Sequence, residues 1–342
     1  MCVFGITINK RRFSELATSF SILSIILASV LISSEGLIAA NATPGTGTLY
    51  GTEPRHNELY TIDPSTGTAT LVGNTVDLVA DEFIRLPSLA VDPATGIMYG
   101  GGGGCSGSPS SGNLYIVDPS NGNLALVGNS DHGNIVGLDF GPDGTLYAAM
   151  NPGFCDPFGG SQLATIDTGT GEATLTSDPF GVNAMGAIAF APDGTLWGAT
   201  ENVGSSGPAL YTISLITGAA SFKANILDAT GSEPSGGFAS IQYACDGILY
   251  AGGGRGFDDF GTINPQNGLF TLIANQVGDT IGGLAFDQSC PATAVVGGQI
   301  IPINVTSLFL AGAFTNAFWI LPTLGGITGA ALVLFKIKGK HS

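Results

Sequence analysis

Charged side chains are scarce in this 342-residue chain, and basic ones are the scarcest. Charged residues make up 11% of the sequence, with 10 Lys and Arg against 26 Asp and Glu. Between positions 43 and 300 only four basic residues, Arg55, Arg85, Lys223 and Arg255, accompany 24 acidic ones. A segment with a formal charge of −20 repels polyphosphates and anionic lipid headgroups. We therefore expect no nucleic-acid partner.

Residues typical of catalytic motifs are also few. The three histidines, His56, His132 and His341, do not form a metal-ligand cluster in the sequence. The chain has no Gly-x-Ser-x-Gly, P-loop or Rossmann motif, because the glycine run 100–104 follows a strand pattern but opens no helix. Hydrophobic residues make up 44% of the chain, however, and 53 glycines suit many turns. This composition predicts a folded, Gly-rich β domain.

One short sequence pattern occurs five times and defines the architecture. Its clearest copies are Leu59–Gly73 and Leu114–Gly128, which share Leu-Tyr-x-x-Asp-Pro-Ser-x-Gly, and weaker copies begin at Leu163, Leu210 and Phe260. The starts lie 55, 49, 47 and 50 residues apart. In each copy two β-rich stretches flank a turn, which predicts a hairpin.

A second hairpin precedes most copies, as in Gly137–Tyr147 and Ala187–Trp197, where Pro-Asp-Gly forms the turn. Four strands per copy and a period near fifty predict an all-β, five-bladed β-propeller. The first copy begins at Thr48–Gly51 without a first strand of its own, whereas Ile281–Asp287 is such a strand with no blade after it. We expect this C-terminal strand to complete blade 1, which removes two exposed sheet edges.

Two recurring sets of residues are predicted to be structural. An aspartate recurs at the hairpin turns, where its side chain is expected to cap the backbone: Asp63, Asp92, Asp118, Asp143, Asp167 and Asp193. An aromatic residue recurs in the second strand of each blade, where we expect it to pack one blade on the next: Tyr50, Tyr99, Tyr147, Trp197 and Tyr250.

The N-terminus resembles an export signal. Lys10–Arg12 precedes the apolar stretch Leu16–Leu31, and Ala40–Ala42 has the small-x-small pattern of a signal-peptidase site. Residues 1–42 are therefore predicted to be a signal peptide. An uncleaved signal anchor is the alternative.

The C-terminus carries a predicted membrane anchor. Ser307–Phe335 contains no charged residue over 29 positions, which is long enough to cross a bilayer with some tilt. The lysines that follow it favour a cytoplasmic tail, with the propeller outside the cell and anchored in the cytoplasmic membrane. A buried soluble helix is the alternative. The predicted segments are a signal peptide (1–42), a propeller (43–294), a linker (295–306), a transmembrane anchor (307–335) and a cytoplasmic tail (336–342).

Four of the five cysteines fall in loops of neighbouring blades, and Cys2 lies in the predicted signal. Cys245 lies in the first hairpin turn of blade 5, and Cys290 lies at nearly the same place in blade 1. Cys105 and Cys155 occupy equivalent loops of blades 2 and 3. Four cysteines allow three pairings, of which the blade register favours Cys245–Cys290 and Cys105–Cys155. Four free thiols are the alternative, although export favours disulfides.

The segments Val296–Thr306, Leu310–Ala313 and Trp319–Pro322 resemble the C-terminal anchor of many exported surface proteins of ammonia-oxidising archaea. That anchor has Gly-Gly-x-Ile-Ile-Pro-Ile, a Leu-Ala-Gly-Ala run, a Trp and a Pro, and then basic residues. Asn304 replaces its usual acidic residue and creates an Asn-x-Thr sequon, so Asn304 is a glycosylation candidate. The repeats are similar to YVTN and NHL propellers, a resemblance that implies the fold and little about activity.

Acidic residues in the loops before the first strand of each blade are candidate Ca²⁺ ligands, because hard cations prefer oxygen ligands. The candidates are Asp77, Asp81, Glu82, Asp131, Glu233 and Asp279. No contiguous loop has EF-hand or nonapeptide spacing, so a solvated acidic rim is the alternative. Four of the six, Asp81, Glu82, Asp131 and Glu233, are also the candidate acid and base of a glycosidase.

The sequence thus predicts a cell-surface, membrane-anchored propeller that acts as a binding, adhesion or envelope interaction module. An envelope protein or a glycan is the expected ligand. The alternative is an extracytoplasmic, glycosidase-like hydrolase or lyase that uses channel carboxylates with Ca²⁺. Two or more convergent carboxylates in a narrow channel would favour the enzyme, and an open, Gly-lined channel would favour the binding module.

Overall fold

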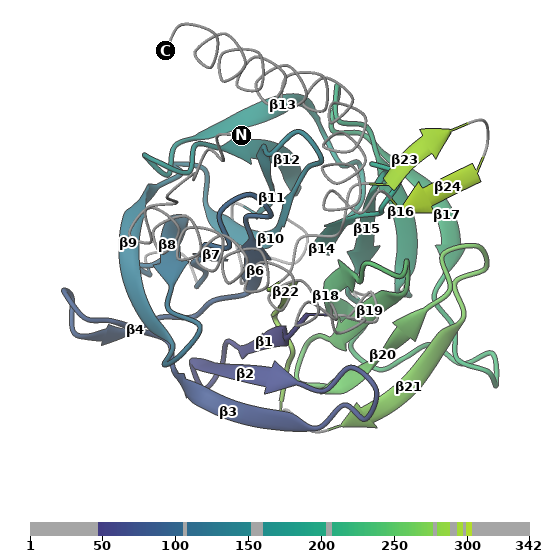
Figure 1. The fold of residues 1–342 in the computed structure, drawn as a ribbon, viewed down its shortest axis with the longest axis horizontal. Coiled ribbons are helices and arrows are strands. Elements are labelled where there is room, and N and C mark those ends of the chain that lie inside the picture. The colour runs from purple at the N-terminus through teal and green to yellow at the C-terminus, as the bar shows by residue number, and fades with distance from the viewer. Residues whose placement is uncertain are drawn as a thin grey trace, which may run out of the picture. The chain divides into compact units, whose positions relative to one another are not determined.

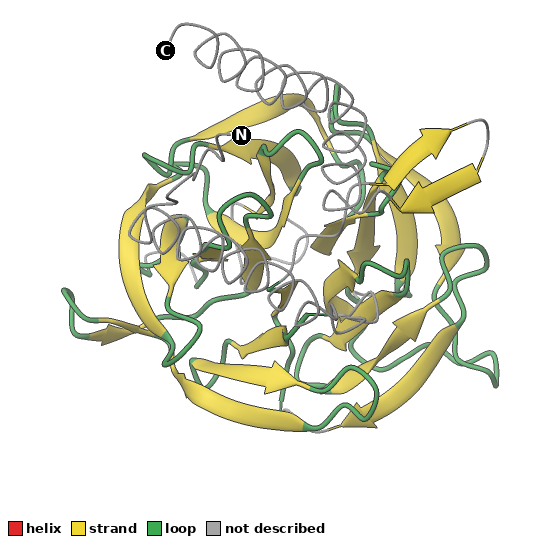
Figure 2. Cartoon of the chain, in the orientation of Figure 1, coloured by secondary structure: helices red, strands yellow, loops and turns green. Residues whose placement is uncertain are grey.

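The computed structural model describes residues 47–104, 108–151, 160–202, 207–275, 279–287, 293–296 and 299–302. This part of the chain consists of strands and loops (Figure 2). The predicted signal peptide and transmembrane anchor lie outside it. Within the described ranges, no helix has the length and apolar character needed to cross a membrane.

Five four-stranded antiparallel blades surround a central axis and confirm the predicted five-bladed propeller (Figure 1). The strands are given from the innermost to the outermost; blade 1 contains β22 (Gly283–Phe286), β1 (Leu49–Glu53), β2 (Glu58–Ile62) and β3 (Ala69–Asn74), and blade 2 contains β6 (Ser88–Val91), β7 (Met98–Gly101), β8 (Asn113–Val117) and β9 (Asn123–Asn129). Blade 3 contains β10 (Asn134–Phe140), β11 (Leu146–Asn151), β12 (Gln162–Ile166) and β13 (Ala173–Pro179), and blade 4 contains β14 (Met185–Phe190), β15 (Leu196–Thr200), β16 (Ala209–Ile213) and β17 (Ala220–Asn225). Blade 5 contains β18 (Phe238–Tyr243), β19 (Leu249–Gly253), β20 (Asp259–Ile263) and β21 (Phe270–Asn275).

The ring closes as the sequence predicts. The late strand β22 pairs antiparallel with β1, in a register from Leu49 opposite Phe286 to Thr52 opposite Gly283. Blade 1 therefore contains strands from both ends of the propeller. Because the innermost strands of all five blades contact one another in a cycle, the sheet array has no open gap between blades.

The recurring aromatic residues pack blade against blade, as expected. A tyrosine in the second strand of one blade meets a phenylalanine in the innermost strand of the next, with these centroid distances: Tyr99–Phe140 5.8 Å, Tyr147–Phe190 5.2 Å and Tyr250–Phe286 5.8 Å. Tyr50 and Trp197 join the hydrophobic clusters between blades 1 and 2 and between blades 4 and 5. The rings are tilted or edge-to-face, and such pairs stabilise the interfaces beyond their buried area alone.

The recurring aspartates cap turns, which confirms their structural role. Each carboxylate accepts a hydrogen bond from the backbone N–H two residues later. The donor and acceptor pairs are Ser65 to Asp63, Ala94 to Asp92, Ser120 to Asp118, Thr145 to Asp143, Gly169 to Asp167 and Thr195 to Asp193. The Ser65 and Ser120 hydroxyls lower the pKa of Asp63 and Asp118, and the Gly169 N–H lowers that of Asp167. Hydrogen bonds to the charged carboxylate explain these shifts.

The glycine that ends the clearest repeats has a packing role. Gly128, on the outer strand of blade 2, lies against the turn of blade 3, and a Cβ there would be 1.9 Å from the Thr170 carbonyl oxygen. Gly73 of blade 1 meets the turn of blade 2 in the same way, where a Cβ would be 2.2 Å from the Asn121 carbonyl oxygen. The repeat therefore encodes a backbone-to-backbone contact between consecutive blades.

Two short hairpins lie outside the regular blades. Strands β4 (Val76–Asp77) and β5 (Glu82–Phe83) pair with each other, and β4 pairs in parallel with β9 at the outer edge of blade 2. Strands β23 (Thr293–Val296) and β24 (Gln299–Pro302) form a hairpin in the segment where the sequence places the start of the linker. Cys245 is disulfide-bonded. Since Cys290, Cys105, Cys155 and Asn304 lie outside the described residues, the two pairings and the glycosylation site stay predictions.

Candidate functional site

A pocket opens on the central axis at the end of the propeller where the innermost strands begin. It has a volume of about 540 Å³. Further along the axis the five innermost strands enclose only about 10 Å³. The free space on the axis therefore narrows sharply beyond this pocket, which we refer to as the cup.

The floor of the cup consists of one residue from each blade, all at the same position just before or at the start of the innermost strand: Pro87, Val136, Gly186, Ala239 and Gly282. In blades 3, 4 and 5 the register shifts at this residue, so that it is the extra residue of a β-bulge. Bulges re-aim side chains beside binding sites. Because all five floor residues are small, the cup stays open.

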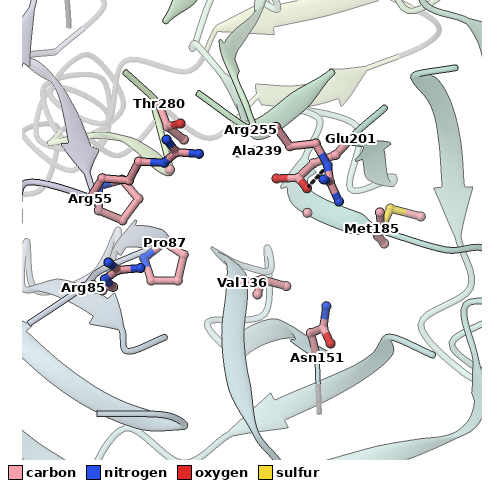
Figure 3. Close-up of a pocket in the computed structure, with 14 residues that line it drawn as sticks. Arg55, Arg85, Pro87, Val136, Asn151, Met185, Glu201, Ala239, Arg255 and Thr280 are labelled. Atoms are coloured by element: carbon pink, nitrogen blue, oxygen red, sulfur yellow. Dashed lines mark ion pairs between the residues drawn. The ribbon is translucent and has the colours of Figure 1, made fainter. Parts of the chain in front are cut away.

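The wall of the cup is more polar than its floor. Loops between the second and third strands contribute Arg55 from blade 1, Glu201 from blade 4 and Arg255 from blade 5. Residues just before the innermost strands add Arg85 and Thr280. Arg55 and Arg85 lie on one side of the cup, and Arg255 and Glu201 lie on the other (Figure 3).

Glu201 and Arg255 form an ion pair on the wall. Arg255 Nε lies 3.1 Å from Glu201 Oε2. The Glu201 backbone N–H donates to the Ala184 carbonyl at 3.0 Å, which fixes this strand end beside the cup. Burial raises the pKa of Glu201, and the nearby guanidinium of Arg255 opposes that rise. Arg255 therefore helps to keep a desolvated carboxylate charged.

Arg55 is held on the opposite wall by two carboxylates. Its Nη1 lies 3.1 Å from Asp279 Oδ2, and its backbone N–H donates to Glu53 at 3.2 Å. Glu53 is fully buried, accepts the His56 backbone N–H, and lies 2.9 Å from His56 Nδ1. The Glu53 carboxylate therefore fixes the turn that carries Arg55 to the cup.

One group of residues in the described part of the chain could hold a metal ion. Glu53, His56 and Glu58 each offer a ligand atom, and these atoms lie within 4.8 Å of one another. The group belongs to the β1–β2 turn of blade 1. The Glu53 carboxylate already accepts hydrogen bonds from the turn and from His56, and Tyr60 donates to Glu58 at 2.6 Å. These contacts account for the cluster as a stabilised turn.

Three of the acidic candidates lie away from the cup. Asp77, Asp81 and Glu82 belong to the β4–β5 hairpin, which pairs with the outermost strand of blade 2. Asp77 is buried and caps the turn of this hairpin by accepting the Val79 N–H at 2.9 Å. The loop before the first strand of blade 2 is long enough to form this outer hairpin, so its acidic residues do not converge with those of other blades.

The other three candidates lie on separate loops. Asp131 is exposed, and its backbone N–H donates a hydrogen bond to Asn129 Oδ1 in the same loop. Glu233 is exposed and lies beside Gly207. Asp279 alone reaches a residue that lines the cup, because it pairs with Arg55. None of the six belongs to the cluster of potential metal ligands in the described residues.

The segments before the innermost strands contribute to the lining of the cup, which lies at the end of the propeller where the sequence places the candidate site. The main polar residues of the cup are not among the six acidic candidates. The arginines Arg55, Arg85 and Arg255 were counted only toward net charge. Their signal is positional, because all three fall in loops at one end of the blades, and Arg55 and Arg255 occupy the same loop of neighbouring blades.

The fold and the cup define the class of protein: a five-bladed β-propeller with a polar pocket at one end of its axis. No family model and no curated protein match the chain. One similar solved structure is a gluconolactonase from Xanthomonas campestris, with 16% identity over 69% of this chain and 78% of that one and a TM-score of 0.40. Another is a luciferin-regenerating enzyme, with 12% identity over 75% of this chain and 84% of that one and a TM-score of 0.43. A third is Kuenenia stuttgartiensis hydrazine synthase, with 19% identity over 65% of this chain and 54% of that one and a TM-score of 0.36. This chain therefore spans about half of its length. Similarities this distant carry no conclusion about activity.

Proposed function

We propose that this chain is a binding module whose ligand enters the cup. The observation that supports the proposal is the cup itself. Its volume of about 540 Å³ falls within the range of roughly 300–1,000 Å³ typical of small-molecule sites. All five blades contribute a small floor residue, and three of them do so through a β-bulge, so the pocket is built into the propeller.

The composition of the cup supports binding over the alternative hydrolase or lyase. A glycosidase needs two carboxyl groups that face the same bond. Among the described lining residues Glu201 is the sole carboxylate, and it is paired with Arg255. The floor carries two glycines and no ionisable group. The lack of a second carboxylate among these lining residues supports the binding module over the enzyme.

The proposal extends to the location of the module. The predicted signal peptide at 1–42 would direct export, and the predicted anchor at 307–335 would hold the propeller outside the cytoplasmic membrane. A cup of this size suits the end of a glycan or a short segment of an envelope protein. A rigid propeller on a membrane anchor would present the cup to such a ligand at the cell surface.

Blocking the cup provides the test. We expect Ala239→Trp to abolish ligand binding, because the indole would project from the floor residue of blade 5 into the cup. Saturation-transfer NMR with a panel of neutral and acidic mono- and oligosaccharides would detect binding to the full chain in neutral detergent. Ala80→Trp, on the exposed outer hairpin, is the matched control. Binding that persists in Ala239→Trp would refute the proposal, and a panel without any binder would rule out a glycan as the ligand.

A further inference from the structure

The basic residues of the propeller are concentrated at the cup. Only four occur between positions 43 and 300, against 24 acidic residues. Three of the four, Arg55, Arg85 and Arg255, line the cup. The fourth, Lys223, lies on the exposed outer strand of blade 4. A strongly acidic domain therefore places nearly all of its positive charge around one pocket.

The three arginines differ in how their charge is balanced. Arg55 pairs with Asp279, and Arg255 pairs through Nε with Glu201. Arg85 forms no ion pair with any residue that the structure describes, and its side chain is exposed. Three guanidinium groups therefore line the cup, and Arg85 is the one without an ion pair among the described residues.

The paired arginines can still donate hydrogen bonds into the cup. A guanidinium carries five N–H donors in a rigid fork. Glu201 engages Arg255 at Nε, and Asp279 engages Arg55 at Nη1. Pairing also fixes the two side chains in place, which lowers the entropy that a ligand must remove when it binds. Arg55 and Arg255 are therefore pre-positioned donors, and Arg85 supplies a guanidinium that forms no ion pair with a described residue.

The rest of the cup limits the size and character of the ligand. Apolar surface comes from Pro54, Pro87, Met185 and Ala239, and the volume is about 540 Å³. An inorganic ion would fill only a small part of this space. A ligand that combines one anionic group with an organic body would satisfy both the guanidinium groups and the apolar wall.

We propose that the cup recognises a small organic anion through its carboxylate group; this inference rests on the proposed binding function. The planar guanidinium fork matches the two oxygens of a carboxylate in a bidentate arrangement. At physiological ionic strength the Debye length is about 8 Å. The acidic residues on distant loops are then largely screened, whereas contacts with Arg55, Arg85 and Arg255 at the cup persist.

Isothermal titration calorimetry of the full chain in neutral detergent and 150 mM salt tests the inference. The probes are D-glucuronate and benzoate, their neutral counterparts D-glucose and benzamide, and inorganic phosphate. We expect at least one carboxylate to bind at least about tenfold more tightly than its neutral counterpart and than phosphate. Arg85→Gln should weaken that binding by at least about tenfold, and Lys223→Gln, which removes the same charge from the outer strand, should leave it unchanged.

Arg85 is the position of choice because its replacement leaves no carboxylate unpaired. Arg85→Lys should give an intermediate affinity, since it keeps the charge and loses the fork. Equal affinity for a carboxylate and its neutral counterpart, preference for phosphate, failure of both carboxylates to bind, or an unchanged affinity in Arg85→Gln would overturn the inference. Neutral sugars that bind and are excluded by Ala239→Trp would leave the proposed binding function standing.

Discussion

Replacing Gly128 by alanine should lower the stability of the propeller by about 2 to 3 kcal/mol, because overpacking at a rigid contact forces the backbone to shift. The added Cβ would lie 1.9 Å from the Thr170 carbonyl oxygen and 2.9 Å from its carbon. The opposing atoms are backbone, so no side-chain rotation can relieve the clash. For a domain of this size, Tm should fall by roughly 5 to 10 °C, measured by circular dichroism.

Gly160→Ala is the matched control for this prediction. Among the described residues, no heavy atom lies within 4 Å of the Cβ position at Gly160, and the backbone of Gly160 is not in the left-handed region. Its replacement should therefore leave Tm nearly unchanged or raise it slightly, since alanine restricts the unfolded chain more than glycine does. Equal stability of Gly128→Ala and Gly160→Ala would show that the blade interface yields easily at this contact.

The same contact shows why the fold could be predicted from the sequence. The repeat records local chemistry, and each part has one structural use: the aspartate caps a turn, the tyrosine packs on the next blade, and the final glycine admits a neighbouring turn. Residues such as Asp118 and Gly128 hold these roles through contacts within one blade or with its immediate neighbour. A pattern repeated at a fixed period therefore specifies the whole ring.

The candidate site is harder to predict because it depends on irregular features. Val136, Gly186 and Ala239 line the cup because each is the extra residue of a bulge, and bulges leave no alternation signal in the sequence. The β4–β5 hairpin removes Asp77 and Glu82 from the axis by pairing with the outer strand of blade 2. The symmetry of the blades predicts that this loop faces the axis, but the loop of blade 2 is longer and forms an outer hairpin instead.

Asp139 should make the stability of the propeller depend on pH. This buried aspartate on β10 joins three innermost strands: it accepts the Phe140 N–H at 2.9 Å and the Phe190 N–H of β14 at 2.6 Å, and it bonds the Gln242 side chain of β18. Burial raises the pKa of Asp139 from 3.8 to about 7, and these hydrogen bonds oppose the rise. The desolvation of the charged form outweighs the three donors.

The direction of the pH effect follows from the raised pKa. Between about pH 4 and pH 7 the native protein holds a proton on Asp139 that the unfolded chain releases. The stabilising contribution of Asp139 to the free energy of unfolding is therefore fully present below about pH 4 and is lost as pH rises to about 7. Above about pH 7 the effect of Asp139 on stability no longer changes with pH. The pKa shift corresponds to a change of the order of 4 kcal/mol. Urea unfolding at a series of pH values, followed by tryptophan fluorescence, would measure it.

Asp139→Asn separates this residue from the other carboxylates of the acidic domain. The amide cannot ionise, so the variant should lose most of the decline between pH 4 and pH 7 and approach or exceed wild-type stability at the upper end. The amide also turns one acceptor into a donor facing a backbone N–H, which lowers stability at every pH without changing the slope. Asp131→Asn, on an exposed loop, removes the same charge and should keep the wild-type slope. An unchanged slope in Asp139→Asn would mean that the three innermost strands hold Asp139 in its charged form, with hydrogen bonding dominant over burial at the centre of the propeller.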